Sequence, residues 1–403
     1  MKLLIAGGGT GGHVFPAIAV AKEWLRRGSE RDVVIVGTKR GMEMRLVPEA
    51  GLRLETIRSA GLKGIGGMKL LRNAALLPAS LLDSLGIVRR HGFAAAFGVG
   101  GYASGPMMLA AWMARVPTVI FEPNAEPGFT NRVLARLATR AATAYEDTAA
   151  RWGTKAVVTG CPVRKEFFAI PAIDVAARDS REGDALGKGG QTGRSVLPGR
   201  LEAGGTKLLI TGGSQGAAPI NRAVMEGMKL LAGRKDRLRI VHQTGERDYN
   251  AVREAYARRE VNAEVLPFIE NMAERFAQAD LIVCRSGAIT VAEVAASGRA
   301  AIFIPFAGAT DSHQLRNAQA LASRGAARLV PQPELTGERL AREIFSLIDQ
   351  PSQLSEIGER ARAHARPRAV EEIVDLIEEA AAIRRVGHGD EVRKSGGQEV
   401  EKS

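Results

Sequence analysis

The sequence predicts an α/β protein with two doubly wound domains, each a parallel sheet covered by helices. The chain has 403 residues, which is too long for one ordinary hydrophobic core and suits two domains. Short apolar runs alternate with amphipathic helical patterns along most of its length. In each half a glycine-rich loop follows the first apolar run, at residues 7–12 and at residues 212–217. This repetition predicts two domains of similar topology.

The expected elements follow from these runs. In the first half, a helix is expected over Pro16–Arg27 and strands at Lys2–Ala6, Asp32–Val36, Ala94–Gly98, Thr118–Phe121 and Ala156–Thr159. In the second half, strands are expected at Lys207–Thr211, Leu238–Gln243, Ala263–Pro267, Leu281–Cys284 and Ala300–Ile304.

The domain boundaries come from changes in composition. The alternation stops near residue 165, so the first domain is expected to span residues 1–165. Residues 172–205 are polar and glycine-rich and indicate a flexible linker or insertion. The second domain is expected over residues 206–364, and residues 387–403 form a charged tail that we expect to be disordered.

The charge is unevenly divided along the chain. Of 56 Lys and Arg and 44 Asp and Glu, residues 1–165 hold 23 and 11, which leaves 33 of each for the remainder. A basic first half suits nucleic acid, anionic phospholipid or a phosphorylated substrate. Nucleic-acid binding would favour basic stripes with interleaved aromatic residues, whereas the four tyrosines and three tryptophans are scattered. We therefore expect no nucleic-acid partner.

Two further features bear on cellular location. Cys161 and Cys284 each follow an apolar run, so we expect two buried thiols in a reducing cytoplasm and no disulfide framework. No apolar run reaches the roughly 18 residues that a membrane span needs.

The first glycine loop lies where a phosphate site is expected. Gly7, Gly9 and Gly12 satisfy G-x-G-x-x-G between a strand and a helix, where backbone amides can meet a diphosphate. A nicotinamide-binding domain would also have an acidic residue ending the second strand, but that strand ends in Gly37-Thr38-Lys39. His13 follows the loop and is a candidate general base, with a purely positioning role as the alternative.

Three further segments add polar groups at strand ends. The loop at residues 98–106 is again glycine-rich, which suggests a diphosphate site outside a free nucleotide, and Asn124 ends the next strand. In the second half, Ser214 can add a hydroxyl to its glycine loop. Residues 285–293 open a helix after a strand, where amides can bind phosphate and the Glu293 carboxylate can accept both ribose hydroxyls.

These residues resemble the MurG family, the bacterial peptidoglycan N-acetylglucosaminyltransferases. The resemblance covers about residues 1–165 and 206–380 and rests on six motifs, at residues 8–13, 98–106, 160–164, 212–217, 285–293 and 311–318. It implies a GT-B fold, two Rossmann-like domains with the active site in the cleft between them. The final helix, at about residues 365–385, would pack back on the first domain.

The resemblance also implies the reaction. UDP-N-acetylglucosamine would bind mainly to the C-terminal domain, and the lipid-linked acceptor, undecaprenyl-diphosphoryl-N-acetylmuramoyl-pentapeptide (lipid I), would place its diphosphate on the N-terminal glycine loops. The acceptor C4 hydroxyl would attack the anomeric carbon once, with inversion, to give lipid II. No cofactor or metal is expected, and the sequence has no Asp-x-Asp motif.

Site residues are carried over by position. The implied catalytic residues are His13, as the candidate base, and Asn124. The implied donor contacts are Thr10, Gly11, Gly12, Asn124, Arg164, Ser214, Ile269, Ala288, Ile289, Thr290, Val291, Ala292, Glu293 and Gln314. The implied contacts to the acceptor diphosphate are Gly9, Gly11, Gly12, Gly100, Gly101, Tyr102 and Ser104.

The chain departs from the family pattern in three places. Pro123 stands where the family commonly has Gln, Cys161 replaces the usual Asn, and the insertion at 172–205 is longer than usual.

Residues 61–90 mix leucines with lysines and arginines, which suits an interfacial segment on anionic lipid, with burial in the core as the alternative. We therefore expect peripheral attachment at the cytoplasmic face of the cell membrane, with other cell-wall synthesis proteins as further partners.

The sequence leaves two alternative activities open: transfer to another lipid-linked acceptor, and UDP-N-acetylglucosamine 2-epimerisation on the same architecture.

Overall fold

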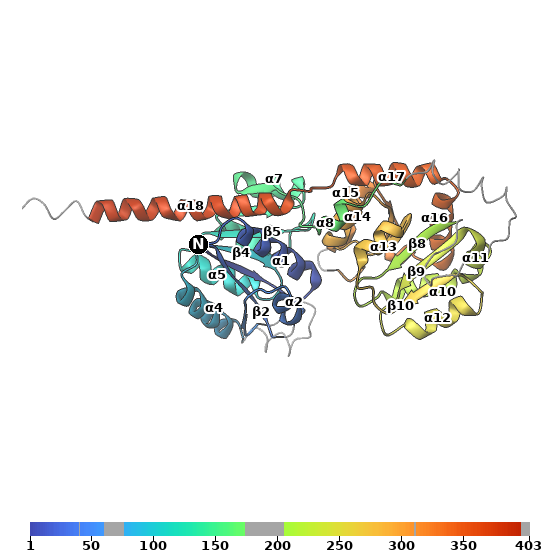
Figure 1. Ribbon diagram of the computed structural model, residues 1–403, viewed down its shortest axis with the longest axis horizontal. Helices are drawn as coiled ribbons and strands as arrows, with labels where there is room; N and C mark the ends of the chain where they lie inside the picture. The colour runs from blue at the N-terminus through green and yellow to red at the C-terminus, as the bar shows by residue number, and fades with distance from the viewer. Residues whose placement is uncertain (40, 60–75, 174–204, 310–311, 396–403) are drawn as a thin grey trace, which may run out of the picture. The chain divides into compact units, whose positions relative to one another are not determined.

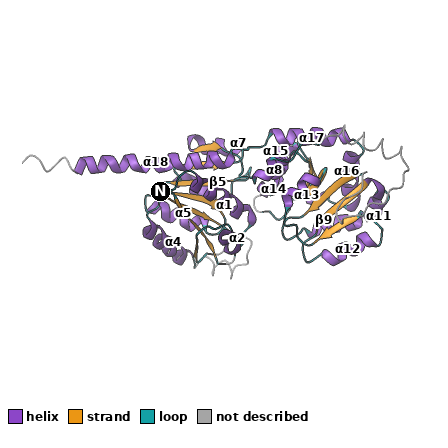
Figure 2. Ribbon diagram, in the orientation of Figure 1, coloured by secondary structure: helices purple, strands orange, loops and turns teal. Residues whose placement is uncertain are grey.

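The computed structural model describes residues 1–39, 41–59, 76–173, 205–309 and 312–395. The chain divides into two compact units, residues 1–163 with 366–403 and residues 164–365 (Figures 1 and 2). The predicted insertion at 172–205 and most of residues 61–76 lie outside the described residues.

The first unit is built on a parallel sheet of seven strands in the order β3-β2-β1-β4-β5-β6-β7. The strands are β1 (Lys2–Gly7), β2 (Asp32–Thr38), β3 (Leu54–Ile57), β4 (Ala95–Gly100), β5 (Thr118–Glu122), β6 (Arg140–Thr143) and β7 (Ala156–Val158). The helices are α1 (Gly11–Arg26), α2 (Glu43–Glu49), α4 (Leu77–His91), α5 (Ser104–Met113), α6 (Phe129–Leu137), α7 (Glu146–Trp152) and α18 (Ala369–Ser395), with a 3₁₀ turn at Gly153–Lys155.

The sheet of the first unit is buried on both faces. Leu4 and Ala6 of β1 face a core that includes Met107 and Met108 of α5. Leu3 and Ile5 alternate with them and are also completely buried, so they face the opposite layer. That burial explains why strands of a parallel sheet read as continuous apolar runs.

Helix α18 joins the first unit although it ends the described chain. It packs against α1, and Arg27, which directly follows α1, forms ion pairs with Asp375 and Glu378 at 2.6 and 3.2 Å. Residues 366–403 hold seven basic and nine acidic residues, so the folded first unit carries +8 and the second +4. The charge excess is therefore less one-sided in the folded units than in the two halves of the sequence.

The second unit repeats the architecture with six parallel strands in the order β10-β9-β8-β11-β12-β13. The strands are β8 (Thr206–Thr211), β9 (Leu238–Gln243), β10 (Ala263–Leu266), β11 (Leu281–Cys284), β12 (Ala300–Phe303) and β13 (Arg328–Leu329). The helices are α8 (Lys165–Phe168), α10 (Ala218–Glu226), α11 (Met228–Ala232), α12 (Tyr249–Ala257), α13 (Met272–Gln278), α14 (Ala288–Ser297), α15 (His313–Ala322), α16 (Gly337–Ile348) and α17 (Pro351–Ala363), with 3₁₀ turns at Lys235–Arg237 and Gln332–Glu334.

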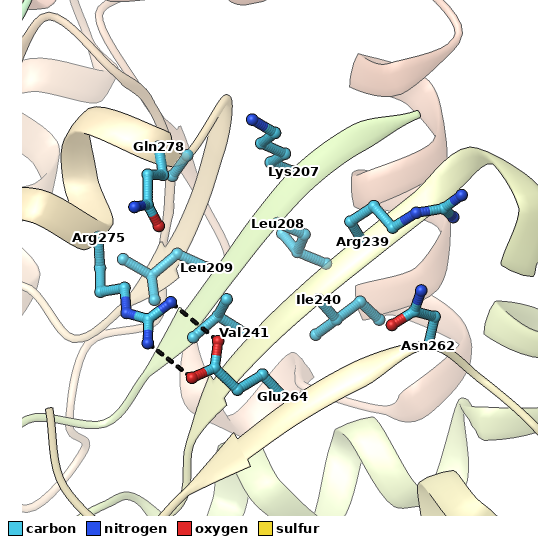
Figure 3. A pocket seen from close by; sticks show the side chains of 11 residues that line it. Lys207, Leu208, Leu209, Arg239, Ile240, Val241, Asn262, Glu264, Arg275 and Gln278 are labelled. Atoms are coloured by element: carbon cyan, nitrogen blue, oxygen red, sulfur yellow. Dashed lines mark hydrogen bonds and ion pairs between the residues drawn. The ribbon is translucent and has the colours of Figure 1, made fainter. Parts of the chain in front are cut away.

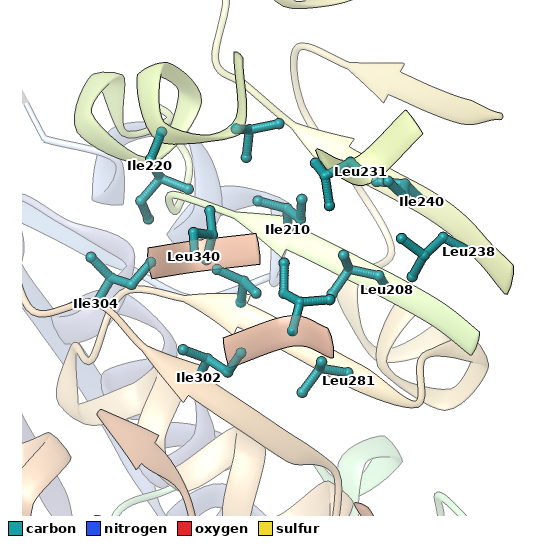
Figure 4. Close-up of a cluster of buried hydrophobic side chains, with 14 of the residues drawn as sticks. Leu208, Ile210, Ile220, Leu231, Leu238, Ile240, Leu281, Ile302, Ile304 and Leu340 are labelled. Carbon is teal, nitrogen blue, oxygen red and sulfur yellow. The ribbon is translucent and has the colours of Figure 1, made fainter. Parts of the chain in front are cut away.

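One hydrophobic core of the second unit lies between its sheet and the helices on one face. Leu208 and Ile210 of β8 pack there with Ile220 of α10 and Leu340 of α16 (Figure 4). The two Rossmann-like sheets confirm the predicted fold class.

One predicted helix boundary needs correction, and three short strands were missed. Helix α1 begins at Gly11 and not at Pro16, because glycines in a first turn cost only about 1 kcal/mol each and packing offsets that cost. Strands β3, β6 and β13 were not predicted. They have at most four residues, and β6 reads Arg-Ala-Ala-Thr without the β-branched run that marks a strand.

The tail prediction also needs correction. Residues 387–395 continue α18, because extending an existing helix is far easier than nucleating a new one. Residues 396–403 lie outside the described part of the chain.

Candidate functional site

Both sheets reverse their strand order at one point, and the predicted loops lie at these points. In the first unit the order turns between β1 and β4, which are followed by the two glycine loops. In the second unit it turns between β8 and β11, which are followed by the Ser214 loop and by α14. Doubly wound sheets bind ligands at the carboxyl ends of strands at such points.

The two glycine loops of the first unit touch each other. A side chain on Gly101 would overlap the carbonyl oxygen of Gly8, and Gly101 also has a φ of +82°. A side chain on Gly100 would lie 2.9 Å from the His13 ring. These glycines are therefore required by packing between the loops, in addition to any approach of a ligand.

His13 lies in the first turn of α1, partly buried against the second loop. Its Nδ1 is 3.3 Å from Oγ1 of Thr10, an exposed residue that immediately precedes α1. Burial lowers the pKa of His13, while a hydrogen bond with the Gly8 backbone and the charge of Glu43 act in the opposite direction. The imidazole is therefore neutral at pH 7 and can accept a proton.

Glu43 is a buried carboxylate beside the first loop that the sequence analysis missed. Its Oε2 accepts a hydrogen bond from the Gly9 N–H at 2.7 Å. Its Oε1 accepts from the N–H and the hydroxyl of Thr38 at 2.9 and 3.0 Å. The sequence feature that could have indicated this residue is the pair of glycines at positions 37 and 41, which precede a single acidic residue.

The remaining acceptor-side residues differ in exposure. Tyr102 is 58% exposed, whereas Ser104 is completely buried at the start of α5. The Ser104 hydroxyl has no hydrogen-bond partner among the described residues, and it lies beside the backbone of Gly98. The roles of these side chains at a diphosphate stay predictions.

Asn124 is held by the last residue of β5. Oε1 of Glu122 accepts hydrogen bonds from the Asn124 backbone N–H and Nδ2 at 3.0 and 2.9 Å. Its other oxygen accepts from the Gly128 N–H and from Nδ2 of Asn131 at 2.9 and 3.0 Å. Glu122 therefore fixes the loop that contains Pro123. Because β4 and β5 are neighbouring strands, this loop adjoins the second glycine loop, which follows β4.

In the second unit, Ser214 is exposed in the loop between β8 and α10. The loop turns through Gly213 and Gly216, whose φ values are +84° and +72°. A side chain on Gly216 would overlap the backbone of Thr244, so the loop packs against the segment after β9.

Helix α14 places Glu293 next to Arg164. Residues 288–292 form the start of this helix, whose first backbone N–H groups have no acceptor within the helix. Nη2 of Arg164 lies 3.3 Å from Oε1 of Glu293, whose side chain is 13% exposed. Burial raises the pKa of Glu293 to about 7, and the Arg164 charge and hydrogen bond act against that rise.

The two other predicted donor contacts use their side chains internally. Ile269 follows β10 with a buried side chain. Oε1 of Gln314, in α15, accepts the Phe306 N–H at 3.0 Å, and the Gln314 carbonyl accepts the Ser286 hydroxyl at 2.8 Å. The second bond joins α15 to the segment that opens α14.

A separate pocket lies away from this strand-end site. It has a volume of about 50 Å³ and is lined by residues of β8 and β9 with Asn262, Glu264 and α13 residues (Figure 3). Arg275 and Glu264 bridge its side with two hydrogen bonds of 2.8 and 2.6 Å. Lys207, near the amino end of β8, is one of its lining residues. None of the lining residues comes from the strand-end loops described above.

Both cysteines are buried, and they form no disulfide with each other. Burial and the nearby charge of Glu293 raise the pKa of Cys284, which keeps that thiol protonated.

Comparisons with known proteins cover nearly the whole chain. The glycosyltransferase family 28 N-terminal domain matches residues 3–143, and the glycosyltransferase family 28 C-terminal domain matches residues 207–373. A protein of Solibacter usitatus (strain Ellin6076) is 43% identical over 381 residues, 94% of this chain and 96% of its own length. That relative is named UDP-N-acetylglucosamine–N-acetylmuramyl-(pentapeptide) pyrophosphoryl-undecaprenol N-acetylglucosamine transferase.

Solved structures agree with the sequence relatives. The crystal structure of Acinetobacter baumannii MurG matches with a TM-score of 0.72 and 32% identity over 94% of this chain and 99% of that one. A UDP-GlcNAc 2-epimerase from Neisseria meningitidis matches with a TM-score of 0.65 at 13% identity, over 94% of this chain and 100% of that one. The second likeness concerns the fold alone, so the fold does not separate transferase from epimerase. The identity and coverage of the relatives do separate them: this chain belongs to the MurG family of family 28 glycosyltransferases.

Proposed function

We propose that this chain transfers N-acetylglucosamine from UDP-N-acetylglucosamine to the C4 hydroxyl of N-acetylmuramic acid in undecaprenyl-diphosphoryl-N-acetylmuramoyl-pentapeptide. The product is lipid II, the disaccharide-linked precursor of peptidoglycan. The observation that carries the proposal is that each sheet has a strand-end site with helix amides at its switch point, within a chain of the MurG family. Two phosphate-bearing substrates need two such sites.

The second unit supplies the donor groups. The first amides of α14 face the phosphate, and the positive end of the helix stabilises the charge of the departing UDP. Glu293, when ionised, accepts hydrogen bonds from the two ribose hydroxyls, and Arg164 balances its charge.

The first unit supplies the acceptor groups and the base. The amides of Gly11 and Gly12 in the first turn of α1 take the acceptor diphosphate. The acceptor oxygen forms a bond to the anomeric carbon while the bond from that carbon to the UDP phosphate oxygen breaks. The hydroxyl proton passes to the neutral imidazole of His13, and the single displacement inverts the anomeric centre.

A transfer assay tests this function. Labelled UDP-N-acetylglucosamine is incubated with and without a lipid I analogue, and both the labelled lipid product and free UDP are measured. We expect labelled product only with the acceptor. Release of label without dependence on acceptor, or formation of an epimerised UDP-sugar, would contradict the proposal.

We also propose peripheral attachment to an anionic membrane at its cytoplasmic side. Among the described helices, none is long and apolar enough to cross a membrane. Helices α4, α5 and α6 pack in series, and we call the exposed apolar and basic residues on and beside them the α4–α6 face. It comprises the apolar residues Leu77, Leu82, Trp112, Met113, Phe129 and Val133 and the arginines Arg89, Arg90, Arg115 and Arg136.

The composition of this face supports lipid binding. Leu82 is 68% exposed and Trp112 46%, and grouped exposed apolar side chains of this size often mark a binding or membrane surface. Apolar side chains beside arginines suit the interface of an anionic bilayer. The predicted core alternative also holds in part, because Ile87 and Val88 of α4 are buried.

Vesicle flotation tests the attachment. The chain should float with vesicles that contain phosphatidylglycerol and much less with vesicles of phosphatidylcholine alone. Leu82→Glu should reduce flotation, whereas Leu230→Glu, at a 44% exposed leucine of the second unit, should not. Indifference to lipid charge, or an equal effect of both substitutions, would argue against the α4–α6 face.

A further inference from the structure

The buried carboxylate of Glu43 lies in a space formed by three glycines. A side chain on Gly8, Gly37 or Gly41 would collide with Glu43. These glycines come from the end of β1, from β2 and from the segment before α2, so three separate segments leave room for this one side chain. Glu43 itself is completely buried.

A buried carboxylate is a costly way to fill such a space. An apolar side chain of similar volume would often give equal or greater stability, because it has no charge to desolvate. Glu43 recovers the cost by accepting three hydrogen bonds, from the Gly9 N–H and from both donors of Thr38. Together these bonds connect the first glycine loop to the end of β2 through the Glu43 carboxylate.

The bond to Gly9 acts at a sensitive point of the loop. Gly9 has a φ of +95° and nothing lies within 4 Å of where its side chain would be, so packing alone does not hold it. Thr10, which follows and immediately precedes α1, makes no side-chain hydrogen bond to the first amides of the helix. The Gly9–Glu43 bond is therefore a specific restraint on the backbone immediately before α1.

We propose that Glu43 is a positioning residue for the transfer reaction. By holding the Gly9 N–H inward, it fixes the backbone from which the α1 amides and His13 are presented to the acceptor. The inference rests on the proposed function in its kinetic part, whereas its structural part concerns the loop alone. Glu43 itself contacts neither substrate.

Substitution of Glu43 by its amide tests the restraint. In Glu43→Gln the side chain keeps its shape but has one acceptor oxygen, so its NH₂ group must face a donor, either Gly9 or Thr38. Glu43→Asp is the second variant, because its carboxylate is one methylene too short to reach both segments. Glu49→Gln, an exposed acid-to-amide change on the same helix, is the matched control.

Three measurements separate positioning from a general structural role. Hydrogen–deuterium exchange follows the peptide that spans residues 8–14, calorimetry gives the affinity for UDP, and the transfer assay gives kcat and the acceptor KM. We expect both Glu43 variants to exchange faster at 8–14 and to lose at least about tenfold in kcat, since displacements of about 1 Å can cost a hundredfold. UDP affinity should be unchanged, because the residues assigned to the nucleotide lie in the second unit.

The outcomes decide the proposal. Exchange and kcat within twofold of Glu49→Gln in both variants would overturn it. A parallel loss of UDP affinity, melting temperature and kcat would also overturn it, because it would indicate general destabilisation. If the wild-type chain shows no acceptor-dependent transfer but Glu43→Gln still speeds exchange at 8–14, the proposed function fails and the loop restraint stands.

Discussion

Lowering the pH from 8 to 6 should weaken the binding of UDP-N-acetylglucosamine about tenfold through one residue, Glu293. Burial raises the pKa of its carboxyl to about 7, against the opposing effect of Arg164. Only the ionised form can accept hydrogen bonds from both ribose hydroxyls. The ionised fraction falls from about nine-tenths at pH 8 to about one-tenth at pH 6, and apparent affinity scales with the competent fraction.

Isothermal titration calorimetry between pH 5.5 and 8.5 measures this dependence. The intact donor is the right ligand because its two phosphates are diesters and do not titrate in this range, unlike the terminal phosphate of UDP. Glu293→Gln is the control, and it should bind the donor more weakly with an affinity that changes little with pH.

Two results would refute the reasoning. A wild-type affinity that is constant from pH 6 to pH 8 would mean that the ionisation of Glu293 does not govern binding. A Glu293→Gln variant that keeps the wild-type affinity would remove Glu293 from the ribose site.

Three further outcomes are expected. His13→Ala should lower kcat by about 10² to 10⁴ with unchanged UDP affinity, and unchanged turnover at saturating substrates would eliminate His13 as the base. Gly101→Ala should lower the free energy of unfolding by about 2 kcal/mol or more, because the new side chain overlaps Gly8 at a positive φ. Gly51→Ala is its control, since φ there is +74° with open space around it, and an equal loss in chemical denaturation would contradict the overlap. Glu293→Gln should raise the free energy of unfolding by on the order of 1–3 kcal/mol at pH 8. This gain should vanish near pH 4.5, because a raised folded-state pKa costs stability only as the pH rises towards and above 7; a gain that persists at pH 4.5 would show another cause.

Most of the fold was predictable because its signals are local. The segments Leu238–Gln243 and Leu281–Cys284 are strands with the predicted bounds. Leu281–Cys284 is buried throughout, and burial on two faces leaves a continuous apolar run. The loops after β1, β4 and β8 were identified by their glycines, and the segment after β11 was identified by the helix that begins there. The short edge strand β13 was missed, because two residues carry no periodicity.

The site was predictable only in part. His13, Asn124 and Glu293 were singled out because polar residues after apolar runs lie at the ligand-binding edge of a parallel sheet. Glu43 and Glu122 were not, because an acidic residue's burial depends on which backbone amides the folded chain brings to it. No local pattern states that the Gly9 N–H points at residue 43.

Local features of the sequence were enough to predict the two-domain α/β class, the strand-end loops and the family resemblance, because periodicity, glycine placement and motif spacing are properties of neighbouring residues. The family resemblance had also implied that the final helix joins the first unit. Only the folded molecule shows that Gly8 and Gly101 touch and that Glu43 restrains the loop before His13. These features depend on contacts between segments that are distant in the chain. Such contacts arise from close packing and from the need to satisfy buried polar groups, and these requirements exist only in the folded molecule.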